Sequence, residues 1–260
     1  IQRYDLEAGL QPDEEKLNIR ARVHLLSGPR QTDTLTFLFG RHFHLDSVHR
    51  IDSTTPDASD ELFFKHEEDL LAVRWPEELQ AGQSVSLRFD YSADWVGMAT
   101  GAALSSLGQT QGGLLPDMLW YPAGDFSSRS VYQGSFTVPR SLKVVSIGQM
   151  TGELLKEDSR QVTWEAEVPF WGITFGYAPF QLEKREIEIS GRRVELSCYV
   201  LPESAGQAVA VLDELERILR FYSELFVLYP YNSFKAAQAP WLAGGYGSPT
   251  LVYLAGEAFT

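Results

Sequence analysis

Few residues of this chain could support catalysis, and none of them completes a catalytic motif. Zinc hydrolases carry HExxH, in which two imidazoles one helical turn apart bind the metal. The nearest string here, residues 66–70 (HEEDL), lacks the second histidine. Asp117 and Asp125 are a candidate carboxylate pair for acid–base hydrolysis. The sequence has no G-x-S-x-G nucleophile elbow and no GxxxxGK[ST] phosphate loop.

A glycine-rich string and a group of aromatic residues are the other candidates for binding. The string Gly244-Gly245-Tyr246-Gly247-Ser248 precedes a predicted strand rather than a helix, so it lacks the helix dipole that binds phosphate. Trp95, Trp120, Tyr121 and Trp171 could form a platform that stacks on sugars. The same aromatic residues could equally be core or loop anchors.

The composition excludes several classes of function. The chain has 260 residues, 44% of them hydrophobic and 22% charged, as in ordinary globular proteins. Its formal charge of −13 opposes binding to nucleic acid or to an anionic membrane surface. No apolar run reaches the roughly 18 residues of a transmembrane helix. The single cysteine, Cys198, lies in an alternating strand pattern, and we expect it to be a small buried apolar group.

The first 180 or so residues have the period of β-strands. Residues 17–25 and 85–91 alternate between apolar and polar side chains, which indicates strands with one buried face. Shorter candidate strands lie at 34–39, 61–64, 70–75, 131–138, 143–147 and 161–166. Many short strands separated by turns predict a mainly β fold, an antiparallel β-sandwich. The Gly/Ser-rich stretch 97–113 is expected to be a long functional loop.

The pattern changes near residue 184. Residues 187–200 read as a hairpin, and an apolar stripe at i, i+3, i+4 spacing predicts one long helix over 208–226. Ser204 and Gln207 have the spacing of a capping box before that helix. We therefore divide the chain into a β-sandwich domain, 1–184, and an incomplete α+β segment, 185–260.

The order of these features resembles the N-terminal half of the M1 (gluzincin) zinc aminopeptidases. The matching strings are Leu119–Asp125 (LWYPAGD), Phe136–Pro139, Val144–Gly148, Phe175–Phe180, Leu219–Phe226, Tyr229–Tyr231 and Gly244–Val252. The resemblance covers the whole chain loosely and is specific from about residue 110 onward. It implies a saddle-like β-sandwich domain followed by the beginning of a thermolysin-like catalytic domain.

The resemblance also implies a set of substrate-binding residues. The string Gly244–Ser248 takes the place of the GxMEN exopeptidase motif, with Gly247 at the Glu position and Ser248 at the Asn position. The string Thr110–Gly113 takes the place of the second amine-binding element, with Gly113 at its last position. The implied substrate-binding residues are Gln111, Gly113, Gly244, Gly245, Tyr246, Gly247 and Ser248. Both amine-binding carboxylates are replaced by glycine, so ordinary aminopeptidase specificity is not expected.

The zinc ligands of the family follow the glycine string by a few tens of residues. We therefore expect this chain to be an N-terminal fragment of an M1-like metallopeptidase, inactive alone, with zinc bound in the full-length parent. It would shape the peptide-binding cleft with residues 105–118 and 244–248. The alternative is a non-catalytic β-sandwich module that binds protein or carbohydrate.

Two further expectations concern the surroundings of the protein. The chain starts at Ile1 rather than at Met, which either a cleaved signal peptide or a boundary set within a longer chain would explain. An exported protein, periplasmic or extracellular, is slightly favoured over a cytoplasmic one. An incomplete second segment would leave part of the stripe at 208–226 uncovered, which predicts self-association.

Overall fold

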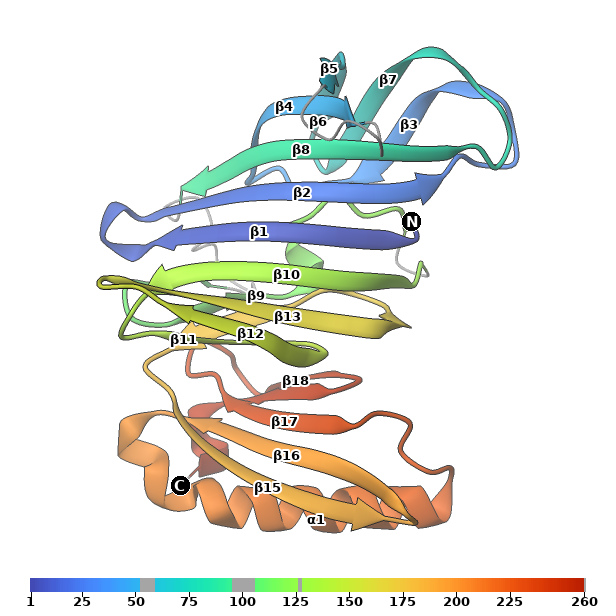
Figure 1. Ribbon diagram of the computed structural model, residues 1–260. Helices are drawn as coiled ribbons and strands as arrows, with labels where there is room; N and C mark the ends of the chain where they lie inside the picture. Colours follow the sequence, from blue (N-terminus) through green and yellow to red (C-terminus); the bar gives the residue numbers. More distant parts are fainter. Residues whose placement is uncertain (52–58, 95–105, 126–127, 260) are drawn as a thin grey trace.

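The computed structural model describes residues 1–51, 59–94, 106–125 and 128–259 (Figure 1). The fold is mainly β, as predicted, with one long helix among the described residues. Two predicted features, Trp95 and most of the 97–113 loop, lie outside the described residues.

The largest sheet has eight strands in the order β12-β13-β10-β1-β2-β8-β4-β5. Their bounds are Arg3–Gln11 (β1), Lys16–Leu26 (β2), His44–Ile51 (β4), Ser59–Glu61 (β5), Ser84–Asp94 (β8), Ser130–Pro139 (β10), Gln149–Leu155 (β12) and Ser159–Phe170 (β13). The pairs are antiparallel except β1 with β10, which is parallel.

Two smaller sheets complete the first part of the chain. One has the order β3-β7-β6 and the other β11-β14-β9. Their strands are Thr32–Leu38 (β3), Phe64–Glu67 (β6), Leu70–Leu79 (β7), Gly112–Leu114 (β9), Lys143–Ser146 (β11) and Phe175–Ala178 (β14). Short 3-10 helices cover Pro12–Glu14, Pro116–Met118, Pro202–Gln207 and Gly256–Phe259.

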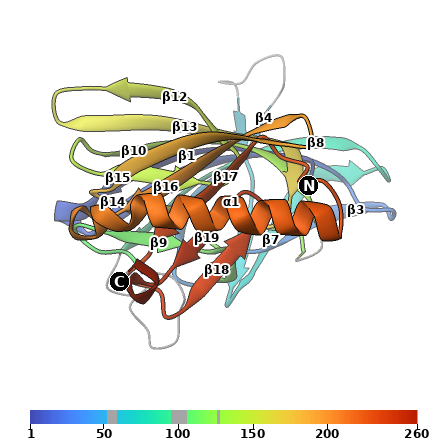
Figure 2. The same cartoon turned by 90° about the horizontal axis from the view of Figure 1, so that it is seen from below.

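The fourth sheet belongs to the last 80 residues and has the order β15-β16-β17-β19-β18. Its strands are Gln181–Ile189 (β15), Arg192–Val200 (β16), Ser233–Gln238 (β17), Gly245–Ser248 (β18) and Leu251–Leu254 (β19). Helix α1, Ala208–Leu225, crosses one face of this sheet (Figure 2). The other face packs on the first part of the chain, because side chains such as Tyr199, Ala237 and Tyr253 belong to the main hydrophobic core. The division at residue 184 stays a prediction.

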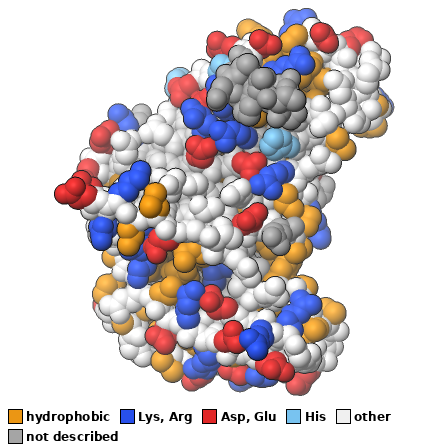
Figure 3. Space-filling model, viewed as in Figure 1, with side chains coloured by type: hydrophobic (Ala, Val, Ile, Leu, Met, Phe, Trp, Pro, Cys, Tyr) orange, Lys and Arg blue, Asp and Glu red, His pale blue; other side chains and the backbone are white. Residues whose placement is uncertain are grey.

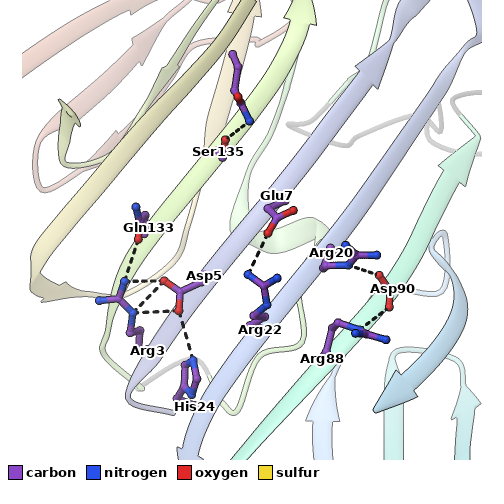
Figure 4. A network of polar contacts seen from close by, with 11 residues as sticks. Arg3, Asp5, Glu7, Arg20, Arg22, His24, Arg88, Asp90, Gln133 and Ser135 are labelled. Carbon is purple, nitrogen blue, oxygen red and sulfur yellow. Dashed lines mark hydrogen bonds and ion pairs between the residues drawn. The ribbon is translucent and has the colours of Figure 1, made fainter. Parts of the chain in front are cut away.

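The large sheet has one buried face and one charged face. In β1, Tyr4, Leu6 and their alternate neighbours are buried, while Arg3, Asp5 and Glu7 project to the other side. Basic and acidic side chains are interspersed over the surface that Figure 3 shows. On the charged face of the sheet they form ion pairs: Arg3–Asp5 at 2.6 Å within β1, and, between neighbouring strands, Arg22–Glu7 at 3.0 Å and Arg20–Asp90 at 2.6 Å (Figure 4). These half-exposed pairs add little stability each.

Helix α1 starts later than its predicted cap. The backbone from Pro202 to Gln207 is a 3-10 helix, and Gln207 at the N-cap position makes no side-chain capping bond. The predicted capping box is therefore wrong. The Ser204 hydroxyl instead accepts a hydrogen bond from Nε2 of Gln238 (3.0 Å), which ties this turn to β17.

The predicted apolar stripe of the helix is divided into two parts. Leu212, Leu215 and Leu219 are buried against the sheet, mainly on β16. The large apolar side chains of the last turn and just beyond it are exposed: Phe221, Tyr222, Leu225, Phe226 and Val227.

The two parts of the chain meet at Gly148, in the connection between β11 and β12. Its N–H donates to Oγ1 of Thr250 (2.9 Å), and its carbonyl accepts from Nζ of Lys235 and from Oγ of Ser233 (3.4 Å). Lys235 is only 3% exposed, and its Nζ lies 5.1 Å from the centre of the Trp164 ring. Polar groups of β17 and of the β18–β19 connection thus bind the backbone N–H and C=O of one residue of the first part.

Gly148 is needed at this position for two reasons. Its φ is +77°, and a Cβ there would lie 2.0 Å from the carbonyl oxygen of Glu165. We predict that Gly148→Ala lowers the free energy of unfolding by about 3 to 5 kcal/mol, from left-handed strain plus a backbone clash. The matched control is Gly191→Ala, with φ +82° and open space around the added methyl group. It should cost only about 1 to 2 kcal/mol in urea titrations. Equal losses would contradict the clash.

Candidate functional site

The predicted glycine string forms the edge strand β18. Among the described residues, β18 pairs only with β19, on one side. The amide of Ala255 donates to the carbonyl of Gly244, and hydrogen-bonded pairs alternate along an antiparallel ladder. The backbone groups of Gly245 and Gly247 therefore point away from β19. The backbone N–H and C=O groups of these two glycines could therefore pair with an extended chain along this edge of the sheet.

Tyr246 lies between these two glycines and reaches the first part of the chain. Its side chain packs against the main core and lines a cavity of about 170 Å³. Asp117 of the Pro116–Met118 turn lines the same cavity. Burial raises the pKa of Tyr246 above its usual range, and Tyr121 and Asp117 add smaller effects in the same direction. The glycine string and the wall formed by residues 116–125 thus face each other across one cavity.

The second predicted element lies beside this string but has no room for a side chain. Gly113 is in β9, paired with Gly176 of β14, and Gln111 directly precedes that strand. A Cβ on Gly113 would lie 2.8 Å from the Phe175 carbonyl oxygen and 2.9 Å from Cζ2 of Trp241. The Trp241 indole therefore occupies the space that an amine-binding Glu or Gln at position 113 would require. Around Gly247, by contrast, nothing lies within 4 Å of a Cβ.

The loop before β9 is fixed where the structure describes it. The Tyr177 hydroxyl accepts from the Gly108 amide (3.0 Å) and donates to the Gly108 carbonyl (2.7 Å). Ser106 forms a β-bridge with Gly113. These contacts attach the end of the predicted functional loop to β9 and β14.

The remaining sequence candidates separate into buried and exposed residues. Trp120 is completely buried, and its Nε1 donates to the Ile173 carbonyl (2.9 Å), so it cannot stack on a sugar. Trp171 is 45% exposed at the cavity with Asp117. Asp125 accepts two hydrogen bonds from Ser128, at 2.7 and 2.9 Å. Cys198 is buried as predicted, and burial raises the pKa of its thiol to about 12.

The described residues include no group of three or more His, Cys, Asp and Glu side chains that could hold a metal ion. In the described part of the chain, no helix has the length and hydrophobicity needed to cross a membrane.

Comparison with solved structures identifies this architecture. The chain matches the M1 zinc metallopeptidase of Deinococcus radiodurans with a TM-score of 0.81 and 17% identity, over 98% of this chain and 60% of that one. The chain folds like the N-terminal part of an M1 zinc metallopeptidase. A mutant of that enzyme bound to a Tyr-Ser-Ala substrate matches with a TM-score of 0.80, as does a two-domain M1 zinc metallopeptidase bound to L-tryptophan, each at 17% identity and 60% coverage.

Comparison of sequences gives a more limited result. No protein-family model matches the chain. It is 27% identical over 122 residues to transcription initiation factor TFIID subunit 2 of Danio rerio, a match that spans 45% of this chain and 10% of that protein. The chain thus spans 60% of the matched M1 structures and 10% of the TFIID subunit.

Sequence reasoning missed Trp241 and Lys235. Trp241 stands three residues before the glycine string, and no local pattern shows that it packs on Gly113. Lys235 stands between Phe234 and Ala236-Ala237 in β17, and a charged residue between apolar neighbours was the available signal.

The two glycines at the amine-binding positions should respond differently to a carboxylate. We predict that Gly113→Glu lowers Tm by about 6 °C or more, because the side chain meets backbone and indole atoms. Gly247→Glu should change Tm by less than about 2 °C, since its Cβ meets open space. Adding Trp241→Ala to Gly113→Glu should restore part of the loss. Thermal unfolding of the four proteins tests this, and a tolerated Gly113→Glu would refute it.

Proposed function

We propose that this chain is the N-terminal part of an M1-like zinc metallopeptidase and supplies two walls of its peptide-binding cleft. The observation that carries the proposal is the free edge of β18, with the backbone groups of Gly245 and Gly247 directed outward beside a cavity wall that includes Asp117. An extended peptide can add to such an edge by main-chain hydrogen bonds. The M1 fold and the peptide bound to one structural neighbour support this interpretation.

The specificity that we propose differs from that of an ordinary aminopeptidase. An N-terminal ammonium loses its hydration in the cleft and needs a charge partner. Gly247 supplies none, and at position 113 the Trp241 indole fills the space. The parent protein would therefore bind peptides without recognising a free α-amino group at these positions, or it would be a pseudo-enzyme. Gln111 remains as a polar side chain next to β9.

The proposal places the zinc site outside these 260 residues. The chain alone is then expected to have no peptidase activity. We further propose the domain division at residue 184 and an exported location, both carried over from the sequence.

Peptide addition to β18 can be tested with two substitutions at one position. Gly247→Pro removes a free-edge N–H, and proline is tolerated on edge strands. Gly247→Ala keeps that N–H and serves as the control. With ¹⁵N-labelled protein, N-acetyl-Tyr-Ser-Ala should shift the amide signals of residues 245–248 for wild type and Gly247→Ala. Gly247→Pro should weaken binding about tenfold or more. Shifts confined to other residues, or no shifts up to about 10 mM peptide, would contradict the proposal.

A non-catalytic interaction module remains the second candidate. The observation in its favour is the similarity to a TFIID subunit, a component of a multiprotein factor by its name. We expect the partner of such a module to be a protein rather than a carbohydrate. Of the two predicted platform tryptophans that the structure describes, Trp120 is buried, so Trp171 alone is exposed for stacking on a sugar.

We also propose that the isolated chain self-associates through the exposed end of helix α1. Phe221, Tyr222, Leu225 and Phe226 are each more than half exposed there. Light scattering of the wild type should show concentration-dependent dimers, and Phe221→Ser with Leu225→Ser should give a monomer. Leu154→Ser, an equally exposed apolar residue on β12, is the control and should leave dimers intact. A monomeric wild type at about 100 μM would contradict the prediction.

A further inference from the structure

The cavity beside Tyr246 combines aromatic walls with carboxylates. Tyr121 and Phe170 are almost completely buried and form its inner part, while Trp171 is exposed at its rim. The aromatic and acidic residues that line it are Tyr4, Tyr121, Phe170, Trp171, Tyr246, Asp117 and Asp125. No lysine, arginine or histidine is among its lining residues.

Asp117 is an unusual carboxylate in this protein. Asp5, Asp69 and Asp90 each form a salt bridge with an arginine. Asp117 forms no salt bridge with any residue that the structure describes, and burial raises the pKa of its carboxyl above the usual value. Asp117 is an exposed residue that also lines the cavity, so its carboxylate is accessible to a cation, and a positive charge nearby favours the ionised form.

We propose that this cavity binds an alkylammonium group, the side chain of a lysine in a bound peptide. Asp117 supplies the charge partner, and the aromatic rings supply the favourable surroundings of an ammonium. A metal ion would need further ligands, and the described residues offer no group of three. The inference deepens the proposed function, because Tyr246 connects the cavity to the edge strand.

The position of the cavity favours a side chain over the N-terminal amine of a peptide. A peptide that pairs with β18 would use the free-edge groups of Gly245 and Gly247, which lie in the plane of the sheet. Tyr246 projects from that plane into the cavity. Side chains of a paired strand also leave the plane, and the four-carbon stem of a lysine can reach beside Tyr246 while its backbone stays on the edge.

The test uses the 260-residue chain and small probes in calorimetric titrations. N-acetyl-lysine methylamide should bind at least tenfold more tightly than the uncharged N-acetyl-norleucine methylamide. Asp117→Asn should remove this difference, and Trp171→Ala, an exposed substitution that spares the core, should weaken lysine binding several-fold. Asp158→Asn changes the same charge at an exposed turn and should have no effect.

Three outcomes would overturn the inference. They are equal binding of the lysine and norleucine probes, unchanged affinity in Asp117→Asn, and tighter binding of alanine amide, whose cation is an α-ammonium. Gly247→Pro separates this inference from the proposed function, because it disables the strand edge and should leave the binding of the free lysine probe unchanged.

A stability measurement gives a second readout. Because the pKa of Asp117 is raised in the folded state, the folded protein binds more protons than the unfolded one, and stability falls as the pH rises through this pKa. The test compares the change in Tm caused by Asp117→Asn at pH 7 with the change that it causes near pH 3. The change at pH 7 should be more positive by about 1 to 3 °C. The other titratable groups that face the cavity are Asp125, Tyr4, Tyr121 and Tyr246. A lower Tm at pH 7 would show that Asp117 has a stabilising partner.

Discussion

The backbone of Gly148 joins the sheet that carries the glycine string to the first part of the chain. Thr250, Ser233 and Lys235 all bond to it, and they come from β17 and from the turn between β18 and β19. The Tyr253 hydroxyl adds a hydrogen bond to the Val145 carbonyl (3.2 Å) in the preceding strand, β11. The same strands carry the glycine string, so the spacing between the free edge and the first part of the chain depends on this contact. The positive φ and the closeness of Glu165 leave glycine as the residue that fits.

Lys235 shows how a polar group can join two apolar parts. It shares a face of β17 with Ala237, which belongs to the main core, while Ala236 on the opposite face packs toward helix α1. Burial lowers the pKa of this lysine to about 7. Either protonation state can donate to the Gly148 carbonyl, and the ammonium form also gains from the Trp164 ring. The hydrogen bond to Gly148 therefore persists whether this lysine is charged or neutral. An arginine at this position would always carry its charge.

The sequence predicted part of the regular strand pattern, but it missed strand β1, whose side chains alternate between the buried and the other face. Strands β2 and β8 bury every second residue and were found from the pattern alone. Strand β4 was missed because a register shift between Leu45 and Ser47 breaks the alternation, and β12 because none of its side chains is buried. At the site, the glycine string was expected only to precede a strand, and in the structure it forms the edge strand β18 itself. The packing of Trp241 on Gly113 and the aromatic cavity join distant segments, and no local spacing records them.

The two glycines that resemble amine-binding positions have different physical meanings. At Gly247 nothing lies within 4 Å of where a Cβ would be, so the structure has room for a side chain at this position. At Gly113 the neighbouring backbone and the Trp241 ring occupy the space, and a carboxylate there requires changes in at least two other places. The packing of Trp241 and of the β14 backbone around position 113 therefore requires glycine there and leaves no room for a carboxylate side chain. The cation site that we propose uses Asp117 instead, which lines the same cavity as Tyr246.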